Sequence, residues 1–186
     1  MSLQATTWQT VGPYFRIGLA HLNCIEMAPE GTPRERVTLE GSVLDGSGIA
    51  VPDAVIEVWQ ANADGEYAAN VAVNTSVPVF TGFCRVPTDD GGRFRFSTVR
   101  PGQVPGPAGQ MQAPHLAVRV MMRGLLRDLA TRMYFPGEMT ARDPILQSVP
   151  AHRRGTLIGS DVPGRKGTVV WNIEMQGERE TVFLDY

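Results

Sequence analysis

Few side chains in this sequence stand at spacings that would build an active site on their own. The three histidines, His21, His115 and His152, lie far apart, and none belongs to an HxH, HExxH or Cys/His cluster, so their spacing shows no local metal site. The two cysteines, Cys24 and Cys84, form no CxxC pair. They neither define a disulfide framework nor make a zinc site, and a reducing compartment is the simpler expectation.

Motifs for nucleophilic and nucleotide chemistry are also missing from the sequence. There is no GxSxG elbow to expose a nucleophilic serine, and Ser47, Ser97 and Ser148 stand in turn-like contexts. No GxGxxG follows an expected strand, and no Walker loop occurs. The residues alone therefore name no reaction.

The elements that would position any site are expected to be short strands. The chain has 20 glycines and 14 prolines among 186 residues, and this excess over ordinary usage indicates many turns. Residues 115–122 alternate so that Leu116, Val118 and Val120 share one face while His115 lies on the other. The period of two predicts a strand there.

Turn residues divide the rest of the chain into pairs of expected strands. The apolar blocks on either side of the turns at 45–48 and 89–92 predict two hairpins. The remaining expected elements are strands at 115–122, 128–135, 168–175 and 180–186, with a turn or two of helix within 143–154. The fold class is thus all-β, a single β-sandwich domain of about eight strands over residues 37–186, preceded by an extended N-terminal arm and loop at residues 1–36.

The charge balance excludes two classes of partner. The chain carries 17 basic and 19 acidic residues, a formal net charge of -2, and its pI is about 5.9. This supplies no basic field for nucleic acid or for an anionic membrane surface. There is no basic stretch followed by an apolar leader and no apolar run of 18 residues, so a cytoplasmic protein is expected.

Six segments, in the same order along the chain, resemble the intradiol ring-cleaving dioxygenases. The DGxG turn followed by EVWQANADGEY is the most specific of them. The segments are TVGPYF at 10–15, GSVLDGSGIAVPDAVIEVWQANADGEY at 41–67, TDDGGRFRFSTVRPG at 88–102, APHLAV at 113–118, TRMYFPGE at 131–138 and the closing QGERETVFLDY.

The resemblance implies a ferric, non-haem enzyme that inserts both atoms of O2 into a small aromatic diol, 3,4-dihydroxybenzoate, and cleaves between its hydroxyls. Catalytic chains of this family hold iron with two tyrosines and two histidines. Tyr67 matches the first tyrosine and His115 the first histidine. Val104 stands in place of the second tyrosine, Ala117 in place of the second histidine and Gln112 in place of an expected arginine.

These replacements predict that the chain holds no catalytic iron. Residues i and i+2 of a strand point to one face, so an HxH pair can close two coordination positions, whereas Ala117 offers only a methyl group. Iron(III) is a hard cation that needs anionic oxygen donors as well as imidazole. We therefore expect no catalytic residue and no metal in this chain alone, with Tyr67, Val104, His115 and Ala117 as vestigial ligand positions. The resemblance implies that Fe(III) is held by a homologous beta-type partner chain.

The resemblance further implies that this chain lines the partner's substrate pocket. The matching positions are Thr10, Gly12, Pro13 and Tyr14 in the arm and Arg132 in TRMYF. A Gly-Pro backbone can approach an aromatic ring closely, Tyr14 adds a planar face, and Arg132 is a permanent cation suited to a carboxylate.

Three alternatives stay open on the sequence. Arg132 can instead form a surface ion pair, with Arg119 filling the vacated pocket. The chain can be a self-sufficient dioxygenase that recruits His21 or His152, although the missing tyrosine and histidine argue against this. It can also be a binding module that keeps a catechol-sized pocket without chemistry.

Overall fold

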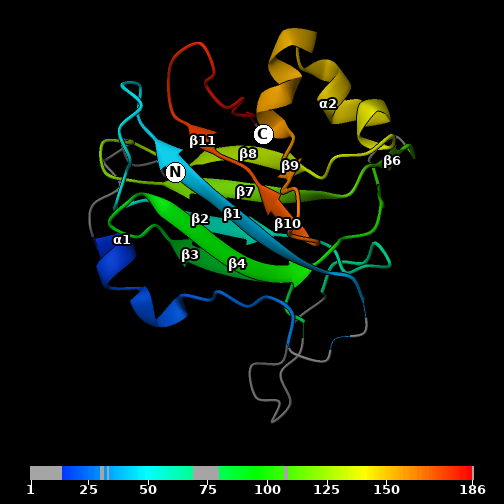
Figure 1. Ribbon diagram of the computed structural model, residues 1–186, viewed down its shortest axis with the longest axis horizontal. Helices are drawn as coiled ribbons and strands as arrows, with labels where there is room; N and C mark the ends of the chain where they lie inside the picture. The colour runs from blue at the N-terminus through cyan, green and yellow to red at the C-terminus, as the bar shows by residue number, and fades with distance from the viewer. Residues whose placement is uncertain (1–13, 30–31, 33, 69–79, 107–108, 186) are drawn as a thin grey trace, which may run out of the picture.

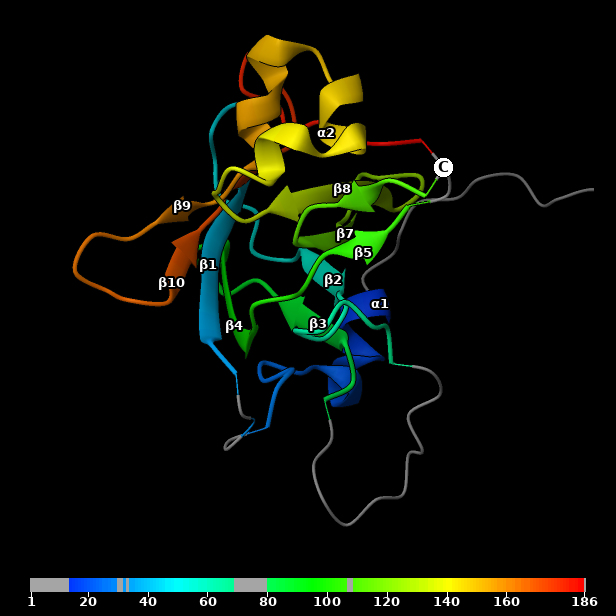
Figure 2. The same ribbon diagram turned by 90° about the vertical axis from the view of Figure 1, so that its right-hand side faces the viewer.

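Two β-sheets packed face to face make up most of the molecule. The computed structural model describes residues 14–29, 32, 34–68, 80–106 and 109–185. In Figure 1 one sheet faces the viewer and the other lies behind it, and Figure 2 shows the two layers from the side. The all-β sandwich expected from the sequence is confirmed.

The first sheet is built around one long central strand, β1 (Arg36–Leu44). On one side β1 pairs antiparallel with β4, and on the other it pairs in parallel with β10 and then β11, with β9 beyond β10. The bounds of these partners are Arg93–Val99 for β4, Ser160–Asp161 for β9, Thr168–Val170 for β10 and Ile173–Glu174 for β11.

The second sheet is a four-stranded antiparallel sheet in the order β3-β2-β7-β8, and a two-stranded ribbon, β5-β6, stands apart from it. Among the described residues there are eleven strands, of which β5, β6, β9 and β11 have two residues each, so seven are longer. The bounds here are Val55–Trp59 (β2), Phe83–Pro87 (β3), Val104–Pro105 (β5), Met111–Gln112 (β6), His115–Met121 (β7) and Leu129–Tyr134 (β8).

The core lies between the inner faces of the two sheets, as the alternation predicts. In β4, Phe94 and Phe96 are buried while Arg93 and Arg95 are exposed. Gly41 stands where β1 crosses this core, and a Cβ there would lie only 1.8 Å from the Trp171 carbonyl oxygen, so a side chain does not fit. The core side chains include Val37, Leu39, Val43, Ile56, Val58, Cys84, Val86, Leu116, Val118, Val120, Met133, Val169 and Ile173.

The two predicted hairpins are wrong, although both turns form. The Asp45 carboxylate accepts hydrogen bonds from the N–H groups of Ser47 (2.8 Å) and Ile49 (2.9 Å), but the chain then crosses to the other sheet. β1 pairs with β4, and β2 pairs with β3. A local turn sets where the chain reverses, whereas the choice of partner depends on which strands together bury both inner faces.

A small helical layer covers one end of the sandwich next to β8, which confirms the helix expected within 143–154. It consists of η2 (Thr140–Arg142), α2 (Pro144–Ser148) and η3 (Ala151–Leu157). Its apolar side chains form a second core with Ala113 and Tyr134. Figure 1 shows this layer above β8.

The N-terminal arm is not wholly extended. Its described part contains α1 (Tyr14–Ile17) and η1 (Ala20–Leu22), and residues 24–27 then run beside both sheets. The Cys24 N–H donates to the Arg85 carbonyl (2.9 Å), and the Ser97 N–H donates to the Ile25 carbonyl (2.8 Å). Thr10, Gly12 and Pro13 lie outside the described residues.

The C-terminal segment also differs from expectation. Residues 180–185 form no strand, and the break in the expected strand 168–175 falls between β10 and β11. The Leu184 N–H donates to the Ala130 carbonyl (2.8 Å), so this segment lies along the outer edge of β8 by single contacts rather than as a ladder.

Candidate functional site

His115 is the first residue of β7, and its ring is almost completely buried on the outer side of the second sheet. The register places Tyr134 of β8 opposite it, with ring centroids 5.7 Å apart. His115 Nδ1 lies 2.8 Å from the Ala113 carbonyl oxygen. Because a carbonyl can only accept, Nδ1 carries the proton, and the neutral ring keeps its lone pair on Nε2.

Ala117 follows His115 on the same face of β7, and the residue opposite it on β8 is Arg132. The Arg132 guanidinium donates to the Gln112 side-chain oxygen at 2.6 Å. Burial, and then the positive charge of Arg132, lower the pKa of His115. The position at which the resemblance predicts a second imidazole is therefore a methyl group beside a cation.

Val104 joins the same region through the β5-β6 ribbon. It is buried and pairs with Gln112, the residue that holds Arg132. Tyr67 is half exposed and lies two residues beyond Gly65, whose backbone packs so closely on Gln103 that an added Cβ would lie 2.0 Å from the Gln103 carbonyl oxygen. The structure thus connects Val104, His115 and Ala117, three of the positions expected to be vestigial, and Tyr67 follows a loop packed against the residue before Val104.

Asp143 organises this region, and the sequence reasoning missed it. Its side chain is fully buried and accepts hydrogen bonds from the Ala113 N–H (2.8 Å) and the Tyr134 hydroxyl (2.9 Å), as well as from two N–H groups of α2. Burial and the Asp143 charge raise the pKa of Tyr134. An Asp before a Pro signals a helix start, but nothing local shows that the same carboxylate reaches the loop that orients His115.

Of the two arginines considered for the vacated space, Arg132 is the one that lies there. Arg119 is half exposed and forms an ion pair with Asp128. Its neighbours across the sheet are Glu57 and Ala130, not the residues beside His115.

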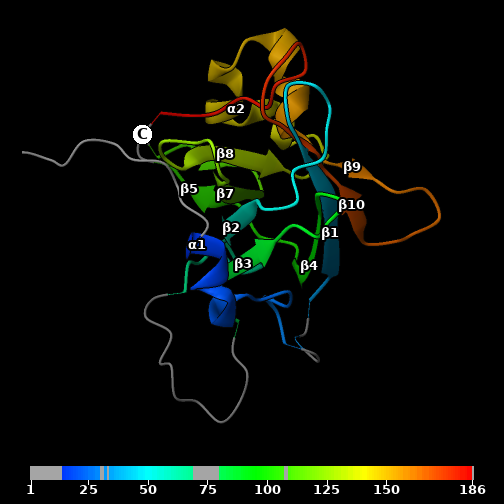
Figure 3. The same ribbon diagram turned by 90° about the vertical axis from the view of Figure 1, so that its left-hand side faces the viewer.

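Tyr14 lies near β3, at the opposite edge of the second sheet from Arg132 on β8. Its side chain is 79% exposed, and its short helix α1 is held to β3 because the Arg85 guanidinium donates to the Phe15 carbonyl. Three strand spacings, about 14 Å, separate β3 from β8. Figure 3 shows α1 beside β3 and away from β8, so the described residues do not join Tyr14 and Arg132 into one site.

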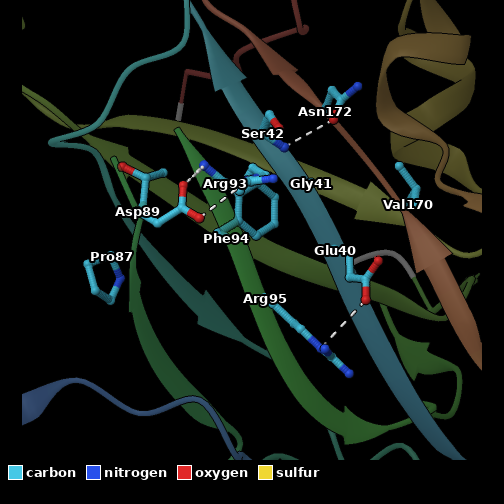
Figure 4. Close-up of a pocket in the computed structure, with 11 residues that line it drawn as sticks. Glu40, Gly41, Ser42, Pro87, Asp89, Arg93, Phe94, Arg95, Val170 and Asn172 are labelled. Carbon is cyan, nitrogen blue, oxygen red and sulfur yellow. Dashed lines mark hydrogen bonds and ion pairs between the residues drawn. The ribbon is translucent and has the colours of Figure 1, made fainter. Parts of the chain in front are cut away.

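A groove of about 700 Å³ on the first sheet contains none of these residues. It is drawn in Figure 4, and Glu40, Arg93, Arg95 and Asn172 are among its lining residues. Its charges are paired: Glu40 with Arg95 at 3.5 Å and with Arg165 at 2.8 Å, and Arg93 with Asp89 at 3.3 Å.

Two further findings concern the described residues only. None of their His, Cys, Asp and Glu side chains gather in a group of three or more that could hold a metal ion. No helix among them has both the length and the apolar character needed to cross a membrane.

The sandwich and the His115 region define the class of protein. Residues 11–177 match the family described as Dioxygenase, and the chain belongs to this family of intradiol ring-cleavage enzymes. It is 39% identical to the protocatechuate 3,4-dioxygenase alpha chain of Burkholderia cepacia and 38% identical to that of Pseudomonas putida, and each alignment covers 99% of this chain and 98% of the relative. The beta chain of the Burkholderia cepacia enzyme is 38% identical over 67% of this chain and 55% of its own length.

Solved structures support the fold. The dioxygenase domain of a carbohydrate-binding fusion protein from Streptomyces sp. SirexAA-E superposes with a TM-score of 0.60 at 21% identity, covering 86% of this chain and 89% of that one. The 3-chlorocatechol 1,2-dioxygenase of Rhodococcus opacus gives a TM-score of 0.58 at 21% identity, covering 79% and 62%.

Proposed function

We propose that this chain is the alpha-type, non-iron-binding subunit of a protocatechuate 3,4-dioxygenase. With a beta-type chain that carries Fe(III), it cleaves 3,4-dihydroxybenzoate between the two hydroxyls in aromatic catabolism. Both atoms of O2 enter the product, 3-carboxy-cis,cis-muconate, so no other oxidant is needed. The alignments with alpha chains cover nearly the full length of both sequences, whereas the alignment with a beta chain is partial. This difference supports the assignment.

The observation that carries the proposal is the pairing of Ala117 with Arg132 beside the single buried imidazole of His115. A ferric ion in this family would need two imidazoles and two phenolates. Here the second imidazole is missing, Val104 supplies no phenolate, and a guanidinium charge lies next to the remaining histidine and repels a metal cation. The residues present do not fit the ion, which supports iron binding by the partner chain.

In this proposal the arm residues Thr10, Gly12, Pro13 and Tyr14 line the partner's substrate pocket. The exposed side chain of Tyr14 supports this role, because its helix is held in place by two contacts. The Arg85 guanidinium donates to the Phe15 carbonyl, and the Arg16 guanidinium donates to the Thr88 carbonyl at 3.3 Å. Arg132 is also proposed to line substrate, because its fork of donors matches a carboxylate. Its distance from Tyr14 makes the two roles separately testable.

The test is co-expression of this chain with a beta-type partner, followed by O2 uptake on 3,4-dihydroxybenzoate and metal analysis of each separated chain. We expect activity from the pair and no stoichiometric iron in this chain. Ferric iron bound by this chain alone, with a tyrosinate-to-iron absorption band, would overturn the proposal. Binding of the diol by this chain, with no turnover by any pair, would favour the binding module instead.

Arg132 is tested in the active pair. Arg132→Ala should raise KM for 3,4-dihydroxybenzoate about tenfold, the loss typical of one charge-assisted hydrogen bond, with a smaller change in kcat. Arg119→Ala is the matched control and should leave KM unchanged, because Arg119 lies outside the His115 region. An unchanged KM in Arg132→Ala would remove Arg132 from the substrate pocket.

The proposal also places the assembly in the cytoplasm. Both cysteines are free thiols, as expected in a reducing compartment. Cell fractionation followed by immunoblotting tests the location.

A further inference from the structure

The two cysteines of this chain lie in contact, although they are 60 residues apart in the sequence. The Cys84 thiol, on β3, donates to the Cys24 carbonyl. The Cys24 N–H donates in turn to the carbonyl of Arg85, the residue after Cys84, at 2.9 Å. Residue 24 and β3 therefore run side by side at this point.

Both side chains belong to the same end of the main core. Cys84 is fully buried in that core, and Cys24 is partly buried and packs against it. Because the two residues are backbone neighbours and pack on the same core, we expect their sulfur atoms to come within reach of each other.

The two thiols differ in their surroundings. Cys24 is partly exposed, and a hydrogen bond from Cys84 lowers the pKa of Cys24. The same contact and burial raise the pKa of Cys84. A partly exposed thiol of lowered pKa next to a buried thiol is the arrangement of an attacking and a resolving cysteine.

We propose that Cys24 and Cys84 form one thiol–disulfide exchange site whose substrates are small-molecule disulfides. The Cys24 thiol gives up its proton, and the resulting thiolate attacks the small disulfide and breaks its S–S bond. The small thiolate that leaves takes up that proton through solvent, and a mixed disulfide remains on Cys24. Cys84 then gives up its proton and attacks the Cys24 sulfur, and the second small thiol leaves with that proton. The protein loses two hydrogen atoms in total, and the small disulfide gains them.

The resulting Cys24–Cys84 bond would tie the N-terminal segment to β3 covalently. That segment already depends on a few hydrogen bonds for its position, and its side chains at Ile17, Leu22 and Ile25 are exposed. A covalent link closes a long loop of the unfolded chain and should raise the thermal midpoint, reversibly with a reductant. The inference does not depend on the proposed dioxygenase function.

The experiment incubates the purified, reduced chain with glutathione disulfide and follows it by intact mass and by non-reducing peptide mapping. The expected product has lost two hydrogen atoms, carries no glutathione, and joins the peptides that contain Cys24 and Cys84. A stable glutathione adduct without the cross-link, or a dimer joined through Cys24, would overturn the proposal.

Two variants test the order of attack. Cys84→Ala should accumulate one glutathione on Cys24, because the resolving thiol is gone. Cys24→Ser should stay unmodified under native conditions, because Cys84 is buried. Modification of Cys84 in the folded Cys24→Ser chain would contradict the assigned roles, and the wild-type cross-link remains decisive if either variant folds poorly.

Discussion

The outer faces of the two sheets carry charged residues in very different settings. On the first sheet, Glu40 lies between Arg95 and Arg165, whose side chains are 71% and 52% exposed (Figure 4 shows the Arg95 contact). On the second sheet, the Arg85 side chain is 1% exposed and pairs with Glu57 at 2.6 Å. The guanidinium groups paired with Glu40 are thus solvated, whereas the Arg85 guanidinium is desolvated, although Arg119 on the same face as Arg85 stays half exposed.

This difference indicates that the polar groups on the outer face of the second sheet are held in fixed positions more strongly than those on the first. An exposed ion pair contributes about 0–1 kcal/mol, whereas breaking a buried one costs about 3–5 kcal/mol. The groove on the first sheet is large, but its paired and solvated charges do not define a reacting centre. In the His115 region, by contrast, the polar groups are buried and bonded to one another.

The comparison is tested most strongly at Asp143. Asp143→Ala leaves the Ala113 N–H, the Tyr134 hydroxyl and two helix N–H groups without their acceptor. We expect a loss of about 4 kcal/mol in the free energy of unfolding, measured by urea denaturation. Asp161→Ala, at an exposed position on β9, is the control and should change it by less than about 0.5 kcal/mol. Equal losses of unfolding free energy in both variants would mean that the hydrogen bonds accepted by Asp143 do not stabilise the His115 region.

A second, smaller loss of stability is expected when an ion pair on each of the two outer faces is broken. Glu57→Ala leaves the buried Arg85 without its counter-charge and should cost about 2–3 kcal/mol, somewhat below the full buried-pair value because the Glu57 side chain is 22% exposed. Arg165→Ala removes an exposed partner of Glu40 and should cost less than about 0.5 kcal/mol. Thermal or urea unfolding measures both, and a larger loss in Arg165→Ala would reverse the comparison.

The smallest effect concerns pH. Because burial and Arg132 hold the pKa of His115 below its usual value near 6.5, the unfolded chain binds this proton more readily than the folded chain. Stability should therefore fall as the pH drops below about 6.5, and His115→Asn should remove that part of the fall. Thermal midpoints at pH 7.5 and 5.5 measure it, with His152→Asn, at an exposed position, as the control. A pH response unchanged in His115→Asn would show that another group is responsible.

Local patterns predicted the faces of strands and the positions of turns. The buried Phe94 and Phe96 and the turn at Asp45 are where the sequence places them, because side-chain alternation and Asx turns depend only on neighbouring residues. The family motifs likewise located His115 and Ala117. They did not show that Arg132 stands opposite Ala117, because that pairing depends on the register of two strands.

Alone, the sequence determined that this chain is an all-β domain and that Val104 and Ala117 stand at two of the four positions where the family resemblance expects iron ligands, since both follow from residue types in order along the chain. Only the tertiary structure decided which strands pair, which arginine lies beside His115, and that Cys24 meets Cys84. The physical reason is the same in each case. Contacts between distant segments are selected by the joint burial of two sheets, and no short stretch of sequence contains that information.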